Sequence, residues 1–245
     1  MGISAKPQRP AFYSLGRGRL GDALTLLHPP YTAWHLSYFA LGAAAAPRVY
    51  GERVLWGLVA FALAVGVAAH ALDELHDRPL RTGLSDRMLV AAAAVSMLGA
   101  LAIGVAGVLY VSVWLAPLVL AGGLFLPAYN LELAGGRFHT DLWFAVGWGA
   151  FPAFTGYFVN AETVALPGLL IAVGCLAMSI AQRRLSAPAR ELRRRTSAVS
   201  GVRTLTDGSS EPLTLAGMLG PLDGALGAMS VAMVLTAGAL LAARL

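Results

Sequence analysis

The sequence predicts an all-α, polytopic membrane protein, a helical bundle of about seven transmembrane helices. Hydrophobic residues make up 57% of its 245 positions and charged residues only 13%. Soluble domains carry about 25% charged residues, so a soluble fold is excluded. Apolar runs close to the length of a bilayer-spanning helix recur along the chain. The basic residues also fall mainly on one side of the resulting topology.

The elements follow one another without any sign of a second folded domain. Residues 1–30 are polar and basic, and we expect them to form an N-terminal segment ahead of one membrane domain, 31–245. Seven apolar segments are predicted to be helices: 31–46, 54–72, 88–105, 108–126, 142–158, 164–181 and 213–243. The last exceeds the about 20 residues needed to span, so we expect an interfacial piece and then a spanning helix from about Leu222. Residues 182–211 are expected to be an arginine-rich loop.

Charge distribution gives the orientation. If the N-terminus is cytoplasmic, all but three of the 18 Lys and Arg residues lie on the cytoplasmic side, the exceptions being Arg48, Arg53 and Arg244. This asymmetry agrees with the positive-inside rule. We therefore expect an integral protein of the cytoplasmic membrane. Its cytoplasmic face would carry four segments: 1–30, 70–83, 129–141 and 182–211.

The first polar motif closes the second apolar segment. On a helix, four ionisable groups fall within a wedge of roughly 100°: His70, Asp73, Glu74 and Asp77. Arg78 precedes Pro79, which predicts that the helix ends there. Carboxylates four residues apart suit Mg²⁺, which takes one or two carboxylates and fills its other positions with water and phosphate oxygens. The alternative is a solvated helix end whose charges lie among the lipid headgroups.

A second polar segment joins the fourth and fifth apolar segments. It contains Tyr129, Asn130, Glu132, Arg137, His139 and Asp141, residue types that suit the binding of polar groups at the membrane surface. Together with the first motif, its Glu132, His139 and Asp141 could form a mixed nitrogen and oxygen site, better suited to Zn, Mn or Fe than to Mg. The alternative is a connecting loop beside an aromatic belt. Glycine and proline in 142–158 are expected to let a neighbouring helix approach closely.

The order of these motifs resembles the UbiA-type intramembrane prenyltransferase superfamily. Its first signature is Asn-Asp-x-x-Asp-x-x-x-Asp followed by a basic residue and Pro-Leu-x-x-Gly. Asp73 and Asp77 match the last two aspartates, and Arg-Pro-Leu-Arg-Thr-Gly at 78–83 matches the tail, whereas Ala69 and His70 stand at the positions of the Asn and the first Asp. The Tyr129 region with its following Trp-Gly and Gly is similar to the family's segment after helix four, and the resemblance covers roughly residues 28–183.

The resemblance implies a bundle around a pocket that is open to the cytoplasm and laterally to lipid. Such a protein binds Mg and an isoprenyl diphosphate or a related lipid and transfers the prenyl group. Asp73 and Asp77 would be catalytic metal ligands supported by Glu74 and His70. The substrate would contact Arg78, Arg81, Tyr129, Asn130 and Arg137.

The chain departs from the family pattern in three ways. The second aspartate motif should close the sixth segment, but no carboxylate occurs there before Glu191. The family's lysine after the Tyr129 position is missing, and seven helices replace the usual nine. Arginines at 183, 184 and 190 could bind phosphate directly as bidentate donors. Alternatively they are solvated positive-inside charges.

These departures leave two further hypotheses. One is a non-catalytic lipid-binding or assembly subunit whose 182–211 loop contacts anionic membrane lipids or a protein partner. The other is a membrane enzyme with the His/carboxylate transition-metal site described above. The sequence has no nucleic-acid-binding motif, so a nucleic acid is not expected as a partner.

Overall fold

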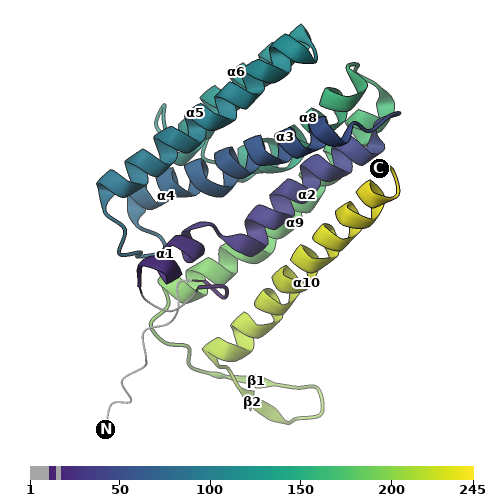
Figure 1. Cartoon of the computed structure of the whole chain (residues 1–245). Helices are drawn as coiled ribbons and strands as arrows, with labels where there is room; N and C mark the ends of the chain where they lie inside the picture. The colour runs from purple at the N-terminus through teal and green to yellow at the C-terminus, as the bar shows by residue number, and fades with distance from the viewer. Residues whose placement is uncertain (1–10, 15–17) are drawn as a thin grey trace.

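A computed structural model describes residues 11–14 and 18–245 of the chain, and these form a bundle of long helices with one short β-hairpin (Figure 1). Six of the described helical segments are long and apolar enough to cross a membrane. A seventh, α2, has 17 residues and is almost entirely apolar. The predicted fold class, an all-α polytopic membrane bundle, is therefore confirmed.

The helical segments come in the following order. The first two are α1 (Arg19–Leu26) and α2 (Pro29–Ala45). Three elements form one continuous segment from Gly51 to Asp77: α3 (Gly51–Phe61), the π-helix η1 (Ala62–Ala69) and α4 (His70–Asp77). Next come α5 (Asp86–Tyr110), the short 3₁₀ turn η2 (Val113–Leu115) and α6 (Ala116–Asn130). A second continuous segment consists of α7 (Asp141–Ala145), the π-helix η3 (Val146–Ala150) and α8 (Phe151–Ala161). The chain then forms α9 (Leu166–Arg194), strands β1 (Val202–Thr204) and β2 (Ser210–Pro212), and α10 (Leu215–Ala242).

Local sequence explains where several helices begin and end. Two prolines open α2, where their missing N–H groups would have no helical partner anyway. The hydroxyl of Thr214 accepts a hydrogen bond from the Gly217 N–H (3.0 Å) and caps α10. As predicted, the second segment ends at Asp77, because Pro79 cannot continue a helix and Arg78 takes a left-handed conformation (φ 50°).

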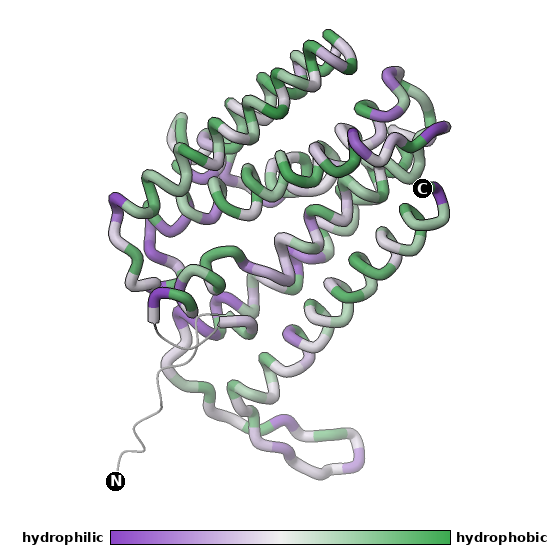
Figure 2. Tube along the Cα trace, in the orientation of Figure 1, coloured by the Kyte–Doolittle hydropathy of each residue, from purple (hydrophilic) through white to green (hydrophobic). Residues whose placement is uncertain are grey.

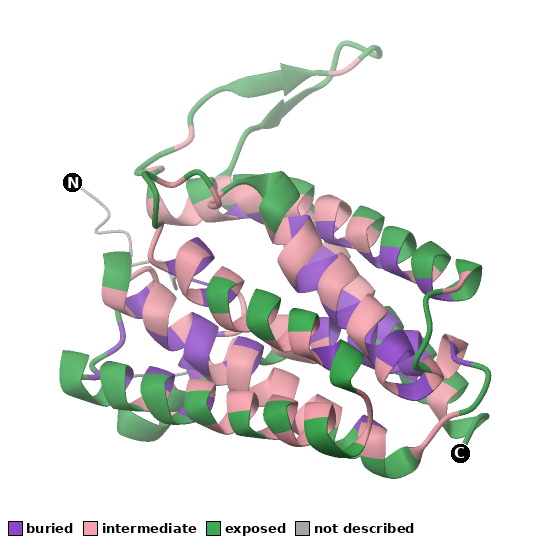
Figure 3. Cartoon of the chain, turned by 90° about the horizontal axis from the view of Figure 1, so that it is seen from above, coloured by how far each residue is buried: buried purple, intermediate pink, exposed green. Residues whose placement is uncertain are grey.

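The outer faces of the bundle are apolar and its polar residues gather toward the ends (Figure 2). Leucine and valine side chains are exposed along α5, α6, α9 and α10, as expected for helices in contact with lipid. The core lies between α2, α8, α9 and α10, where Trp34 and Tyr38 have no exposed surface. Buried and exposed residues alternate along the helices, so each helix has one covered face and one open face (Figure 3). The indole N–H of Trp34 donates to the Tyr38 hydroxyl (2.6 Å), so both polar groups are satisfied inside the core.

Glycines allow α2 and α8 to touch along their backbones. A Cβ added at Gly42 would overlap the Ala153 carbonyl, and one added at Gly156 would overlap the Phe39 carbonyl. Each helix thus contributes one glycine against the partner's backbone, the arrangement that small residues permit between membrane helices. The expectation that glycine in the fifth apolar segment permits close approach is confirmed.

Two boundaries differ from the prediction. The last segment is one helix, α10, and not an interfacial piece followed by a span. Pro221 lies within it, which is tolerated because membrane helices can re-satisfy a freed backbone group locally. The 182–211 region is not a loop throughout, because α9 continues to Arg194 before the exposed hairpin. Arg, Leu, Ala and Glu at 183–194 favour helix, so this polar run was wrongly interpreted as loop.

The polar connections between the helices lie at two opposite ends of the bundle. At one end, which we call the arginine-rich end, His28 stacks on His70 and Arg183 pairs with Asp141, so 70–83, 129–141 and the end of α9 meet as predicted. At the opposite end, Arg244 donates to the carbonyls of Ala46 (2.7 Å) and Pro47 (2.9 Å). A cytoplasmic location of the arginine-rich end stays a prediction.

The α2–α8 contact predicts a position-specific response to a single methyl group. Gly156→Ala should destabilise the protein by about 1–3 kcal/mol, because the added Cβ meets rigid backbone. Gly174→Ala is the matched control, since a Cβ there meets nothing within 4 Å. It should leave the melting temperature in detergent unchanged or slightly higher. Equal melting temperatures for the two variants would contradict the contact.

Candidate functional site

Glu74 anchors the connection that follows α4. Its side chain is fully buried, and its carboxylate accepts hydrogen bonds from the backbone N–H groups of Leu80 (2.9 Å) and Thr82 (2.8 Å). The Thr82 hydroxyl donates a third bond (2.9 Å). Both carboxylate oxygens are therefore engaged, and Glu74 supports the fold of the connection. Its expected supporting role at a metal site stays a prediction.

Arg78 has a similar structural role. Its guanidinium donates to the Leu84 carbonyl (2.6 Å) and pairs with Asp86, which lies at the start of α5. These contacts close the turn between the two helices and use the donors that the phosphate hypothesis required. Arg81, three residues later, has an exposed side chain with no hydrogen bond or ion pair in the described part of the chain.

The two aspartates of the first motif lie in different surroundings. Asp77 is exposed, and its side chain has no hydrogen bond or ion pair among the described residues. Asp73 is partly buried and interacts electrostatically with Arg190, Arg194 and His139, although no ion pair within 4 Å forms. Only Asp73 therefore faces the charged side chains of neighbouring elements. The two aspartates are four residues apart on α4 and share one helix face, but their surroundings differ, and their joint role as catalytic metal ligands stays a prediction.

Two histidines stack at the start of α2 and α4. The rings of His28 and His70 lie 4.0 Å apart at an angle of 11°. His70 Nδ1 lies 3.1 Å from the Gly66 carbonyl, an acceptor that fixes the proton on this nitrogen and leaves Nε2 as the unprotonated nitrogen of the neutral ring. His28 Nδ1 lies 2.8 Å from the Tyr13 hydroxyl. Burial, and after it the charges of His70 and the nearby arginines, lowers the pKa of His28 well below its usual 6.5.

Aromatic rings organise the 129–141 connection. Tyr129 is buried with its ring centroid 4.5 Å from that of His139 and 4.5 Å from that of Trp148. His139 Nδ1 lies 3.0 Å from the Tyr129 carbonyl and 3.7 Å from Glu132. The buried Asn130 amide donates to the Leu126 carbonyl (2.8 Å) within its own helix. Tyr129 thus belongs to the site, whereas Asn130 stabilises the end of α6.

The remaining predicted residues of this connection do not converge on a ligand. The Arg137 side chain is exposed and has no hydrogen bond or ion pair among the described residues. Asp141 accepts a hydrogen bond from Arg183 Nε (2.6 Å) and is an ion-pair partner. All 13 acidic residues and all five histidines of the chain lie in its described part, and there no group of three or more metal-binding side chains forms.

Arginines on α9 take the place that carboxylates were expected to fill. Arg183, Arg190 and Arg194 are seven and four residues apart, so they share one face of the helix. Arg183 lies over the Phe144 ring (5.3 Å from its centroid) as well as beside Asp141. This spacing was visible in the sequence but was overlooked because the region was taken for a loop.

Arg190 and Arg194, which we call the inner arginines, have no carboxylate partner. Among the described residues neither forms an ion pair or a side-chain hydrogen bond, and Arg194 Nε is buried without a partner. Arg190 interacts electrostatically with Tyr31 on α2 and Tyr129 on α6, so it faces the interior. Arg193, in contrast, pairs with Asp223 on α10. Two partly buried positive charges thus lie close together without a negative partner in contact.

An apolar cleft of about 1100 Å³ runs through the other half of the bundle. Its walls come from α3, η1, α5, α6, η3 and α8, and Val65, Leu126 and Trp148 line the part nearest the arginine-rich end. Trp148 lines the cleft and touches Tyr129, which interacts electrostatically with Arg190. These two rings, which we call the aromatic layer, therefore connect the cleft to the inner arginines. The resemblance implies a pocket within the bundle, but the position and walls of this cleft depend on how the helices diverge, which hydropathy does not reveal.

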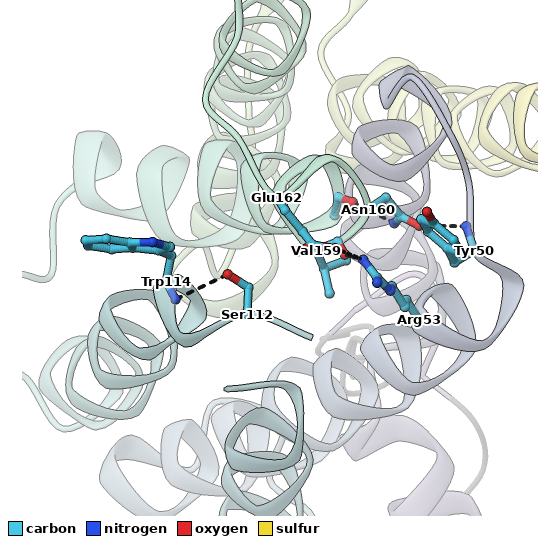
Figure 4. Close-up of polar contacts among 8 residues, drawn as sticks. Tyr50, Arg53, Ser112, Trp114, Val159, Asn160 and Glu162 are labelled. Carbon is cyan, nitrogen blue, oxygen red and sulfur yellow. Dashed lines mark hydrogen bonds and ion pairs between the residues drawn. The ribbon is translucent and has the colours of Figure 1, made fainter. Parts of the chain in front are cut away.

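The cleft reaches the opposite end of the bundle, where polar contacts surround it (Figure 4). Arg53 donates to the Val159 carbonyl (2.9 Å) and pairs with Glu162 (2.7 Å). The Tyr50 N–H donates to the Asn160 side chain (2.8 Å), which ties α3 to α8. These contacts fix the width of the cleft at that end.

No family model, curated protein or solved structure matches the chain. The fold and its apolar helices define the class, an integral membrane protein built as a polytopic helical bundle. Within that class, the candidate site combines the inner arginines, Asp73 and the aromatic layer over the cleft.

The Glu74 contacts predict a specific loss of stability. Glu74→Gln should cost about 1–3 kcal/mol, because an amide group would face N–H donors that now bond to a carboxylate oxygen. Hydrogen exchange of the Leu80 and Thr82 amides should accelerate. Asp77→Asn, three residues along the same helix and exposed, should change neither quantity. Unchanged exchange in Glu74→Gln would remove the anchoring role.

The lowered pKa of His28 predicts acid sensitivity. The folded protein keeps His28 neutral, while the unfolded chain binds a proton below about pH 6.5, so acidification below that value favours unfolding. The slope is at most about 1.4 kcal/mol per pH unit for one group. His28→Asn can retain the left-handed backbone (φ 44°) and the bond to Tyr13 without the titration. Its melting temperature should fall less than that of wild type between pH 7 and pH 5, and identical falls would exclude His28 as the cause.

Proposed function

We propose that the protein is a UbiA-like membrane transferase that binds an isoprenyl diphosphate or a related lipid. The phosphate head lies against the inner arginines and the hydrocarbon tail lies in the apolar cleft. The observation that carries this proposal is the presence of two partly buried arginines without carboxylate partners, next to an aromatic layer and the cleft.

The charge balance supports an anionic head. Removing a charged group from water without a partner is costly, and two neighbouring guanidinium groups also repel each other. Arg190 and Arg194 experience this repulsion, which Asp73 opposes at a distance for both and Asp141 for Arg190 alone. Arginine binds phosphate through paired N–H donors, so a phosphate group supplies both the missing charge and the missing acceptors.

The cleft supports a hydrocarbon tail. Its volume of about 1100 Å³ lies at the upper end of the range for small-molecule sites, and its walls are almost entirely apolar. One wall of the cleft is formed by the helical segment from Gly51 to Val65, which is roughly 20 Å long at about 1.5 Å per residue. A long chain therefore suits it better than a compact polar ligand.

Prenyl transfer needs two kinds of stabilisation, and the site offers both. As the carbon–oxygen bond breaks, its electron pair leaves with the diphosphate, where the inner arginines stabilise the added negative charge. The allylic carbon becomes positive beside the rings of Tyr129 and Trp148, whose faces attract a cation. The acceptor then donates an electron pair to that carbon.

A non-catalytic lipid-binding role is the second candidate. The surroundings of the carboxylates in the first motif favour this non-catalytic role. The Glu74 carboxylate is hydrogen-bonded to the backbone of its own connection, and Asp77 is exposed. This role uses the same head and tail sites without bond breaking. Binding of the lipid without turnover in the presence of candidate aromatic acceptors would support it over the transferase.

Binding measurements test the proposed function directly. Protein in nanodiscs of neutral lipid should bind geranylgeranyl diphosphate, and Arg190→Gln and Arg194→Gln should each weaken binding about tenfold or more, since charge-assisted hydrogen bonds are lost. Arg184→Gln is the control, because this exposed arginine lies on the same helix but outside the inner face. Equal affinity for all four proteins would contradict the proposed head site.

A further inference from the structure

We infer that the inner arginines hold the phosphate head directly, with no divalent cation between protein and ligand. This inference rests on the proposed function and concerns how its head site is built. It departs from the resemblance, which implies Mg bound by two aspartate clusters.

The residues present do not fit a two-cluster metal site. Every acidic residue of the chain is described, and most of those near the arginine-rich end are already engaged. Their partners are Leu80 and Thr82 for Glu74, Arg78 for Asp86, Arg183 for Asp141 and Arg193 for Asp223. Asp77 and Glu191 are exposed, and Glu132 lies beside His139. Asp141 also interacts electrostatically with Arg190, but it is paired with Arg183. Asp73 interacts with both inner arginines and has no hydrogen bond or ion pair of its own among the described residues.

The charges around Asp73 oppose a metal there. A divalent cation at this carboxylate would lie within the field of Arg190 and Arg194, which already attract the same carboxylate. Placing two further positive charges beside these guanidinium groups raises their repulsion. An arginine pair, in contrast, supplies positive charge and paired N–H donors to the negatively charged diphosphate without a further cation that repels the guanidinium groups.

The spacing of the arginines on α9 explains how they can bind one phosphate group together. Arg190 and Arg194 are four residues apart, so their side chains project from the same face toward one region. Arg183 occupies the same face about two turns before Arg190, where its pair with Asp141 holds α9 against α7. In the family pattern this helix would end in metal-binding aspartates, whereas here it presents permanently charged donors.

The effect of Asp73→Asn on affinity distinguishes binding through a metal from direct binding by the arginines, because the two predict changes in opposite directions. If it held a metal that bridges to phosphate, Asp73→Asn would weaken binding. If the arginines bind phosphate directly, Asp73 competes for their charge, and Asp73→Asn should tighten binding about two- to tenfold. The substitution retains the size of the side chain, so a loss of packing does not mimic either result.

The experiment is a titration of the full chain in neutral nanodiscs with geranylgeranyl diphosphate, in EDTA and in millimolar Mg²⁺. The expected result is an affinity that agrees within about threefold between the two buffers, with tighter binding by Asp73→Asn in EDTA. Binding that is strong in Mg²⁺ and at least about tenfold weaker in EDTA would overturn this inference while the proposed function stands. No binding in either buffer would overturn both.

Discussion

The backbone contact between α2 and α8 is the interaction on which the bundle depends. Membrane helices gain little from hydrophobic burial against one another, so close packing decides how they associate. The glycines at 42 and 156 allow carbonyl groups of the partner helix to approach where side chains would normally lie. Because α2 is then fixed beside the 141–161 segment, His35 Nδ1 reaches the Trp148 carbonyl (2.9 Å) at the π-helix η3.

The position of α9 follows from the same region. Gly149 of η3 leaves no room for a Cβ against Ser179 and the Cys175 carbonyl, so α9 packs closely there. The Ser179 hydroxyl donates to Tyr38 (3.3 Å), which links α9 to the α2 core. With its middle fixed, the helix extends beyond the core and carries its arginines to the level of Asp73 and Tyr129. Packing in the apolar half thus determines where the charged half is assembled.

The sequence was sufficient to predict the class, the seven apolar segments and the gathering of three polar regions at one end. These features depend on hydropathy and charge along the chain, which require no knowledge of neighbours. The roles of individual polar residues could not be predicted in this way. Glu74 and Asp73 are adjacent in sequence, yet one bonds to the backbone of its own connection and the other faces a helix more than 100 residues away. Likewise, the many arginines of residues 182–211 suggested a loop, but packing of α9 against α7, η3 and α10 supports a helix to Arg194. The resemblance to the prenyltransferase superfamily stays a prediction.

The most direct measurement of the central claim is an experimental density map of the protein with a non-hydrolysable isoprenyl diphosphate analogue in EDTA. We predict phosphate density within hydrogen-bond distance of Arg190 and Arg194, with the tail passing Trp148 into the apolar cleft. Phosphate density at Asp77 and Arg81, or a head group at the Arg53 end of the cleft, would contradict it.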